Sequence, residues 1–129
     1  MTADFDGDKK LDLAYVSDGV GIVVRKGNGD GTFGATTTIA GTDKLHDLAI
    51  GSFSAVGSVD IVSTSFTQKL NVYPNTGNLT FGAPVLTTTV MGAGGIYQLS
   101  AADLNGDGLT DLAGRGLSAK AGIFLRCAP

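Results

Sequence analysis

Residues 4–13 read Asp4-Phe5-Asp6-Gly7-Asp8-Lys9-Lys10-Leu11-Asp12-Leu13, and nearly the same pattern returns as Asp103-Leu104-Asn105-Gly106-Asp107-Gly108-Leu109-Thr110-Asp111-Leu112. A weaker copy lies between them, Ser52-Phe53-Ser54-Ala55-Val56-Gly57-Ser58-Val59-Asp60-Ile61. A second landmark, Thr32-Phe33-Gly34-Ala35, returns as Thr80-Phe81-Gly82-Ala83. Both landmarks step by 48 residues from the first copy to the second. Two landmarks with one spacing indicate a structural repeat of about 50 residues.

The segments between these landmarks are predicted to be short β-strands. They are rich in β-branched and aromatic residues, and Gly, Asn, Asp and Pro bound them as turn residues. The expected strands are Leu11–Val16, Gly21–Arg25, Val59–Ser65, Leu70–Tyr73 and Gly122–Arg126. The turns Gly27–Gly31 and Asn75–Leu79 align with each other as plain hairpin turns. About four strands per repeat correspond to one β-propeller blade, with a β-solenoid as the alternative.

Composition agrees with an all-β chain that has many tight turns. The chain has 129 residues, of which 20 are Gly, and all twelve acidic residues are Asp. Turns and metal loops favour Asp, whereas helices favour Glu. The net charge is −3, and no basic stripe is present that would suit nucleic acid. Cys127 is the only cysteine, and no apolar run approaches the length of a membrane span.

The two complete loops, Asp4–Asp12 and Asp103–Asp111, are predicted to bind one Ca²⁺ each. Calcium takes six to eight oxygen ligands, and alternating residues of a tight loop point inward together. Positions 1, 3, 5 and 9 supply side chains, and position 7 supplies a backbone carbonyl. The ten candidate ligands are Asp4, Asp6, Asp8, Lys10, Asp12, Asp103, Asn105, Asp107, Leu109 and Asp111. Four acids in the first loop repel one another strongly unless a cation is present.

Two other interpretations of the loops are weaker. An EF-hand needs a bidentate Glu at position 12 and flanking helices, but that position is Tyr15 in the first loop and Gly114 in the last. The middle loop offers only Asp60 together with serines, and Val56 replaces an acid. Metal binding is therefore not expected in the middle loop.

The metal loops, followed by strands and a Gly-Asn-Gly-Asp-Gly-Thr-Phe-Gly-Ala turn at residues 27–35, resemble the FG-GAP/VCBS repeats of integrin α-subunit propellers and secreted bacterial proteins. The resemblance covers residues 1–129, as repeats of about 1–50, 51–100 and 101–129. It implies blades of four antiparallel strands, in which the metal loop joins the innermost strand to the second. The chain would then hold strands two to four of one blade, a complete second blade, and strands one to three of a third. These are about 2.5 blades, so the propeller is incomplete or part of a larger assembly.

The expected function is that of a calcium-stabilised, non-catalytic module of an extracellular protein, serving adhesion, scaffolding or protein–protein binding. Extracellular calcium keeps sites of modest affinity filled. The sequence contains no recognisable nucleophile elbow, catalytic triad signature or zinc motif. One alternative is a lectin-like module that binds a glycan, for which Tyr15, Tyr73 and Tyr97 are the tyrosines available to contact a sugar. The other is an accessory segment of a secreted polysaccharide-acting enzyme.

Incomplete blades also predict association with other blades or with copies of the chain. The sheet edges are expected at Leu11–Val16 and Gly122–Arg126, where unpaired backbone groups would recruit another strand. The apolar sides of the outer blades are expected to need cover at Ile22, Val24, Ile123 and Leu125. Arg25 and Arg126 are predicted to hold matching strand positions, and His46 is expected to be a structural or channel-lining residue of an inner strand.

Overall fold

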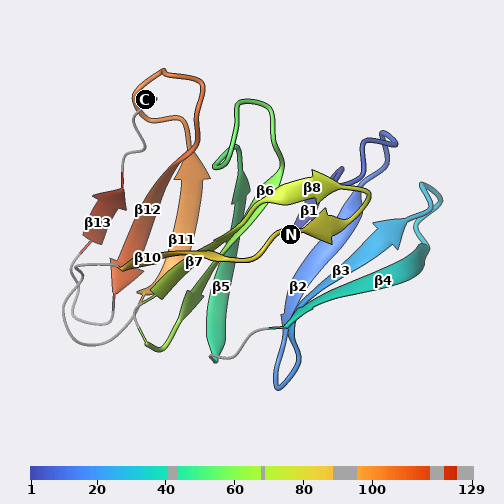
Figure 1. Cartoon of the computed structure of the whole chain (residues 1–129), viewed down its shortest axis with the longest axis horizontal. Coiled ribbons are helices and arrows are strands. Elements are labelled where there is room, and N and C mark those ends of the chain that lie inside the picture. The colour runs from blue at the N-terminus through green and yellow to red at the C-terminus, as the bar shows by residue number, and fades with distance from the viewer. Residues whose placement is uncertain (41–43, 68, 89–95, 117–120, 125–129) are drawn as a thin grey trace.

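The computed structural model of the chain describes residues 1–40, 44–67, 69–88, 96–116 and 121–124. The regular structure in these ranges is entirely β-strand. Three antiparallel sheets stand side by side, and a small hairpin lies beside the first two (Figure 1). The predicted all-β architecture of incomplete propeller blades is confirmed. Within the described ranges, no helix has the length and apolar character that a membrane crossing requires.

Each sheet is a meander, in which strands that follow one another in sequence also pair in space. The first sheet consists of β1 (Thr2–Ala3), β2 (Asp12–Ser17), β3 (Gly21–Gly27) and β4 (Phe33–Ala40). The second consists of β5 (Leu45–Gly51), β6 (Asp60–Ser65), β7 (Lys69–Tyr73) and β10 (Val85–Thr88). The third consists of β11 (Ile96–Ala102), β12 (Asp111–Gly116) and β13 (Ala121–Phe124). The hairpin of β8 (Asn75–Gly77) and β9 (Thr80–Phe81) is inserted between β7 and β10.

The first sheet holds part of an innermost strand that the sequence did not predict. In β1, Thr2 lies opposite Leu13 and Ala3 lies opposite Asp12. Met1 extends the pairing, because its ammonium and carbonyl groups bond to the carbonyl and N–H of Ala14. The predicted open edge at Leu11–Val16 is therefore wrong for its central residues, which are paired on both sides. Two residues are too few to show a strand period, which is why the sequence did not reveal β1.

The register of the second and third strands corrects one predicted equivalence. The residue that follows the ninth-position aspartate lies opposite a fixed partner in each sheet. These pairs are Leu13 with Arg25, Ile61 with Tyr73, and Leu112 with Phe124. Arg25 therefore corresponds to Phe124. Its predicted match with Arg126, which lies outside the described residues, is wrong by two residues. A shift of two residues keeps the same face of the strand, so the apolar pattern could not reveal the error.

Apolar side chains fill the space between the first and second sheets. The buried cluster there consists of Phe5, Ala14, Ile22, Val24, Leu48, Ile61, Tyr73 and Leu79. Ile22 and Val24 have no exposed surface, since the second sheet covers them. The prediction that these two residues need cover from another chain is wrong. The side chains of Ile123 and Leu125 lie outside the described residues.

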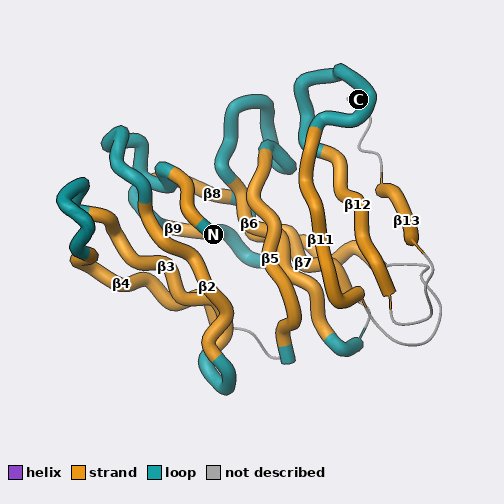
Figure 2. Tube along the Cα trace, turned by 180° about the vertical axis from the view of Figure 1, so that it is seen from behind, coloured by secondary structure: helices purple, strands orange, loops and turns teal. Residues whose placement is uncertain are grey.

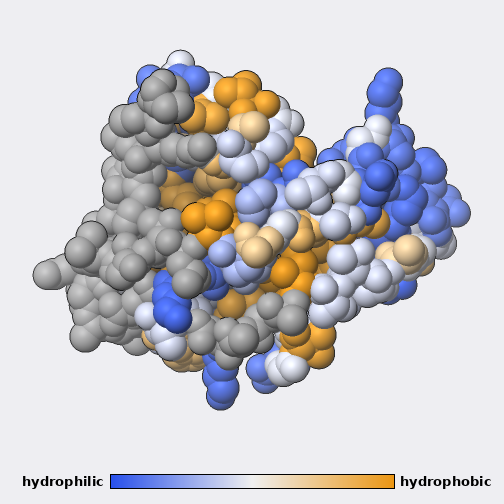
Figure 3. Space-filling model, viewed as in Figure 1, coloured by the Kyte–Doolittle hydropathy of each residue, from blue (hydrophilic) through white to orange (hydrophobic). Residues whose placement is uncertain are grey.

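The second sheet is buried on both of its faces. A second cluster, formed by Ala49, Phe53, Val62, Leu70, Ile96 and Leu112, fills the space between this sheet and the third. Ile61 packs toward the first sheet and Val62 toward the third, as strand alternation requires. All six residues of β6 are consequently buried. In Figure 3, apolar residues lie in the middle of the face, and hydrophilic residues gather at the right-hand end, over the loops of the first sheet.

Candidate metal centre

The three loops that follow the innermost strands lie along the same edge of the molecule. They span residues 4–11, 52–59 and 103–110, and they lie at the top of Figure 1 and Figure 2. The hydroxyl of Thr110 accepts a hydrogen bond of 2.8 Å from the N–H of Ser52, and this bond links the last loop to the middle loop. The side-chain amide of Asn75 donates a bond of 2.9 Å to the carbonyl of Phe5, which links the β8–β9 hairpin to the first loop. The loops are thus positioned by contacts between neighbouring blades.

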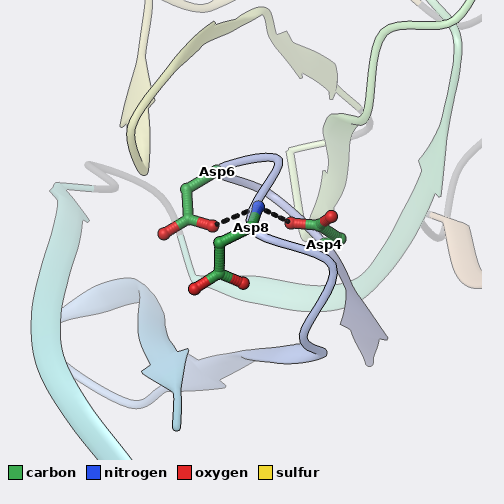
Figure 4. Close-up of side chains that lie close together, drawn as sticks. All are labelled: Asp4, Asp6 and Asp8. Carbon is green, nitrogen blue, oxygen red and sulfur yellow. Dashed lines mark hydrogen bonds between the residues drawn. The ribbon is translucent and has the colours of Figure 1, made fainter. Parts of the chain in front are cut away.

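In the first loop, three carboxylates converge. Asp4, Asp6 and Asp8 each offer an oxygen, and these oxygens all lie within 4.8 Å of one another. Figure 4 shows the three side chains grouped around the N–H of Asp8, which is shared between Asp4 and Asp6 at 3.1 Å each. All three side chains remain partly exposed, so a cation can approach from solvent.

Backbone N–H groups fold the loop around Asp4. Its carboxylate accepts bonds from Gly7 at 2.7 Å and from Lys9 at 2.8 Å, in addition to the bond from Asp8. This wrapping needs left-handed backbone at Gly7, with φ of 82°, and at Lys9, with φ of 68°. Glycine adopts that conformation without strain, whereas at Lys9 it is unfavourable and is held by the loop's hydrogen bonds.

The ninth-position aspartate of the first loop is not part of the cluster. Asp12 has no exposed surface, and its two oxygens accept bonds of 2.8 Å from the N–H groups of Phe5 and Gly27. It therefore joins the start of the loop to the end of β3. The structure brings Asp4, Asp6 and Asp8 together and places Asp12 beneath them as a backbone acceptor.

The same arrangement recurs in the other two blades. Asp60 accepts bonds of 2.9 Å from the N–H groups of Phe53 and Asn75, the counterparts of Phe5 and Gly27. Asp111 is 1% exposed and accepts a bond of 2.9 Å from the N–H of Leu104. The ninth-position aspartate is thus a common structural acceptor of all three blades, including the blade that lacks the other acids.

Two effects oppose each other at Asp60. Burial raises the pKa of this carboxyl, but the N–H of Asn75 and the hydroxyl of Ser58, at 2.7 Å, donate hydrogen bonds to it. The net pKa lies below its ordinary value. The carboxylate is therefore held in its charged form although it has no exposed surface.

The middle loop is closed by hydroxyl groups. Ser58 bonds to Asp60 and to the carbonyl of Ala55, and the hydroxyl of Ser52 donates to the carbonyl of Ser58 at 2.9 Å. Serines thus supply the turn contacts that the acids supply in the first loop, and the loop brings no second carboxylate near Asp60.

The last loop repeats the hydrogen bonds of the first. Asp103 accepts from the N–H groups of Gly106 at 2.7 Å and Gly108 at 2.9 Å, and these bonds, that from Gly108 foremost, lower the pKa of its carboxyl. The carbonyl oxygen of Asn105 accepts from the N–H of Asp107, and its amide donates to the carboxylate of Asp107 at 3.2 Å. Asp103, Asn105 and Asp107 therefore form a second group of oxygen donors around one turn.

The seventh positions, Lys10 and Leu109, take part through their backbone. The N–H of Lys10 donates to Asp8 at 2.9 Å, and the N–H of Leu109 donates to Asp107 at 2.8 Å. The Lys10 side chain is 46% exposed and its ammonium lies 3.8 Å from the Oδ2 of Asp8, whereas Leu109 is buried. The predicted roles of Lys10 and Leu109 concern their carbonyl oxygens, and these roles stay predictions.

Sequence reasoning missed Lys26, a residue of β3. Its ammonium contacts Asp6, and it lies 2.8 Å from Asp8. These hydrogen bonds, that to Asp6 foremost, raise the pKa of Lys26, and the bond from Lys26 is the main cause that lowers the pKa of Asp8. The signal was available in the hairpin register, since Arg25 faces Leu13 and Lys26 must then lie beside Asp12 and the loop that precedes it.

The donor set of the first loop fits calcium in its chemistry. All the converging side-chain atoms are carboxylate oxygens, the ligands that a hard divalent cation prefers. Asp4, Asp6 and Asp8 would hold the ion, with the Lys10 carbonyl as the predicted additional ligand. The last loop offers the same kinds of oxygen with one acid replaced by Asn105.

His46 belongs to the inner strand β5, as predicted. Its ring centroid is 3.5 Å from that of Phe66 and 4.3 Å from that of Tyr97. Phe66 is 54% exposed, so the three rings form an aromatic cluster that reaches the surface where the second and third sheets meet.

Comparison with known proteins supports the repeat. Residues 57–114 match the model of the FG-GAP-like repeat. The match runs from the end of the middle loop through β6 and the strands that follow it into β12, and it includes the whole last loop. No curated protein and no solved structure matched the chain. Residues 57–114 are therefore similar to an FG-GAP-like repeat.

Proposed function

We propose that the chain is a calcium-binding β-propeller module without catalytic activity. The observation that carries this proposal is the convergence of Asp4, Asp6 and Asp8, whose oxygens lie within 4.8 Å of one another. Three carboxylates at this separation repel one another, and a divalent cation relieves the repulsion. Oxygen-only donors on a tight, partly exposed loop suit Ca²⁺ better than softer metals, which prefer nitrogen or sulfur.

The last loop is the second proposed calcium site. Its hydrogen bonds to Asp103 match those to Asp4, so the two loops present their oxygens in the same order along the chain. The middle loop is not proposed to bind calcium, because its serines close the turn around Asp60.

An extracellular location follows from the proposed metal. Loops of this size bind calcium with modest affinity, and only outside the cell is calcium reliably at millimolar levels. The proposed role is adhesion, scaffolding or protein–protein binding through the edge that carries the three loops. Carbohydrate binding is the alternative, favoured by the exposed aromatic cluster of His46, Phe66 and Tyr97, and a glycan array distinguishes the two roles.

Calorimetric titration of the calcium-free protein with CaCl₂ is expected to show two ions bound per chain. Asp8→Ala and Asp107→Ala are each expected to remove one ion, because each deletes a carboxylate at the centre of one loop. Asp18→Ala is the matched control, since Asp18 is an exposed acid in the turn between β2 and β3. No calcium uptake by the wild-type chain would contradict the proposal, and uptake that survives both loop variants would place the ions elsewhere.

Association with further blades or with copies of the chain is the second expectation. β1 pairs with β2 only as far as Ala14, which leaves residues 15–17 of β2 without a described partner on that side. β13 is the outermost described strand of the third sheet. Such edges pair with other strands. Light scattering of the purified chain is therefore expected to show species larger than a monomer, and a sharp monomer at high concentration would refute this.

A further inference from the structure

We infer that Lys26 is a tethered counter-ion of the first loop, which holds the loop together without metal and competes with calcium for the same oxygens. The part of this inference that concerns calcium rests on the proposed function. The part that concerns the metal-free loop rests on the contacts of Lys26 alone.

The ammonium of Lys26 donates to the carboxylate oxygens that accept no hydrogen bond from the backbone of the loop. The backbone N–H groups of the loop occupy both oxygens of Asp4, the Oδ1 of Asp6 and the Oδ1 of Asp8. The two remaining oxygens are the Oδ2 atoms of Asp6 and Asp8, and Lys26 donates to both. Every carboxylate oxygen of the three-acid cluster thus has a donor from within the chain.

A strand position, rather than the loop, supplies this lysine. Lys26 is in β3, between Arg25, which pairs with Leu13, and Gly27, at an irregularity in the pairing of β3 with β4. About a third of its side chain is exposed, at 34%, and the Asp6 side chain is only 9% exposed. A charge held on a strand and partly shielded from water is screened less by salt than a mobile surface lysine.

The second blade supports the pairing of lysine with acids. The register there puts Tyr73 opposite Ile61, so Pro74 takes the place that Lys26 holds in the first blade. In the same blade, the first, third and fifth loop positions are Ser52, Ser54 and Val56. The lysine is absent from the blade that lacks these acids. The third blade has Leu125 at the corresponding sequence position, and there Asn105 replaces the acid at the third loop position.

A calcium ion that uses Asp6 and Asp8 must displace the ammonium. Calcium approaches its ligand oxygens to about 2.3–2.6 Å, and a lysine ammonium cannot remain in contact with the same two oxygens beside it. Binding therefore loses two charge-assisted hydrogen bonds and gains a repulsion between two cations. Lys26 lowers the calcium affinity of the first loop, and it keeps the loop folded when calcium is scarce.

The test compares Lys26→Gln with Lys44→Gln, which removes the same charge at an exposed residue outside the loops. Both are placed in an Asp107→Ala background, so that calorimetry with CaCl₂ reports on the first loop. Lys26→Gln is expected to tighten calcium binding by about tenfold or more relative to the background, and Lys44→Gln by less than about twofold. An unchanged affinity of Lys26→Gln, with calcium binding intact, would overturn the competition.

A second measurement needs no calcium. In excess chelator, Lys26→Gln is expected to melt about 3–6 °C below the wild type, because Asp6 loses its ammonium partner and Asp8 keeps only the more distant Lys10. Lys44→Gln is expected to melt at the temperature of the wild type. Equal melting temperatures of the two variants would overturn the inference that Lys26 stabilises the first loop without metal. If neither the wild type nor any variant binds calcium, the proposed function fails, and the melting difference in chelator still decides the role of Lys26.

Discussion

Replacing Asp60 with alanine is expected to lower the free energy of unfolding by about 3–5 kcal/mol, because it leaves several buried donors without an acceptor. The carboxylate accepts bonds from the N–H groups of Phe53, Ser54 and Asn75 and from the hydroxyl of Ser58. It has no exposed surface, so water cannot easily replace it. Urea unfolding followed by circular dichroism measures the change.

Two further variants make this expectation specific. Asp18→Ala removes an exposed acid of the same type, and a change within about 0.5 kcal/mol is expected. Asp60→Asn keeps the shape of the side chain and one acceptor oxygen, so its decrease in the free energy of unfolding should lie between those of Asp18→Ala and Asp60→Ala. This variant can still be measured if Asp60→Ala does not fold. A loss below about 1 kcal/mol for Asp60→Ala would mean that these hydrogen bonds do not stabilise the blade.

Removal of calcium is expected to have the second large effect. A site filled at a hundredfold excess over its Kd stabilises the native state by about 2.7 kcal/mol, so two proposed sites contribute about 5 kcal/mol. Chelator should therefore lower the Tm of the wild type by at least several degrees. Asp8→Ala should lower the Tm in calcium and shrink the response to chelator by about half, since one of two sites is lost.

The control for this experiment is Asp30→Ala. Asp30 is an acid of the turn between β3 and β4, where it accepts bonds from the N–H and hydroxyl of Thr32. Its loss should leave the response to chelator intact. Identical melting curves of the wild type with and without chelator would show that calcium does not stabilise the fold.

The sequence predicted the fold well where a pattern repeats. The strands at Asp12–Ser17, Gly21–Gly27 and Asp60–Ser65 begin and end within two residues of their predicted bounds, because turn residues flank alternating apolar residues. The hairpin turns near Gly29 and Asn78 were also predicted, and Asn78 adopts a left-handed backbone, with φ of 52°. A repeat of known spacing constrains local structure strongly.

The site was predicted less completely, for two physical reasons. Loop spacing indicates which acids share a turn, and it correctly grouped Asp4, Asp6 and Asp8. It does not indicate how deep each acid lies, so the burial of Asp12 beneath the loop was not foreseen. It also cannot show a partner from another strand, and Lys26, 20 residues after Asp6, therefore escaped notice.

The aspartate that closes the first loop, Asp12, is a different residue from the three acids of the cluster, and this separation has a consequence for how such repeats change over time. Asp60 fastens its blade with the same backbone contacts as Asp12, although its own loop has serine and valine where the first loop has acids. Mutations at the outer loop positions are therefore expected to remove a proposed metal site while the blade beneath stays folded. Under the proposed function, the response to calcium would then differ from blade to blade on a common scaffold.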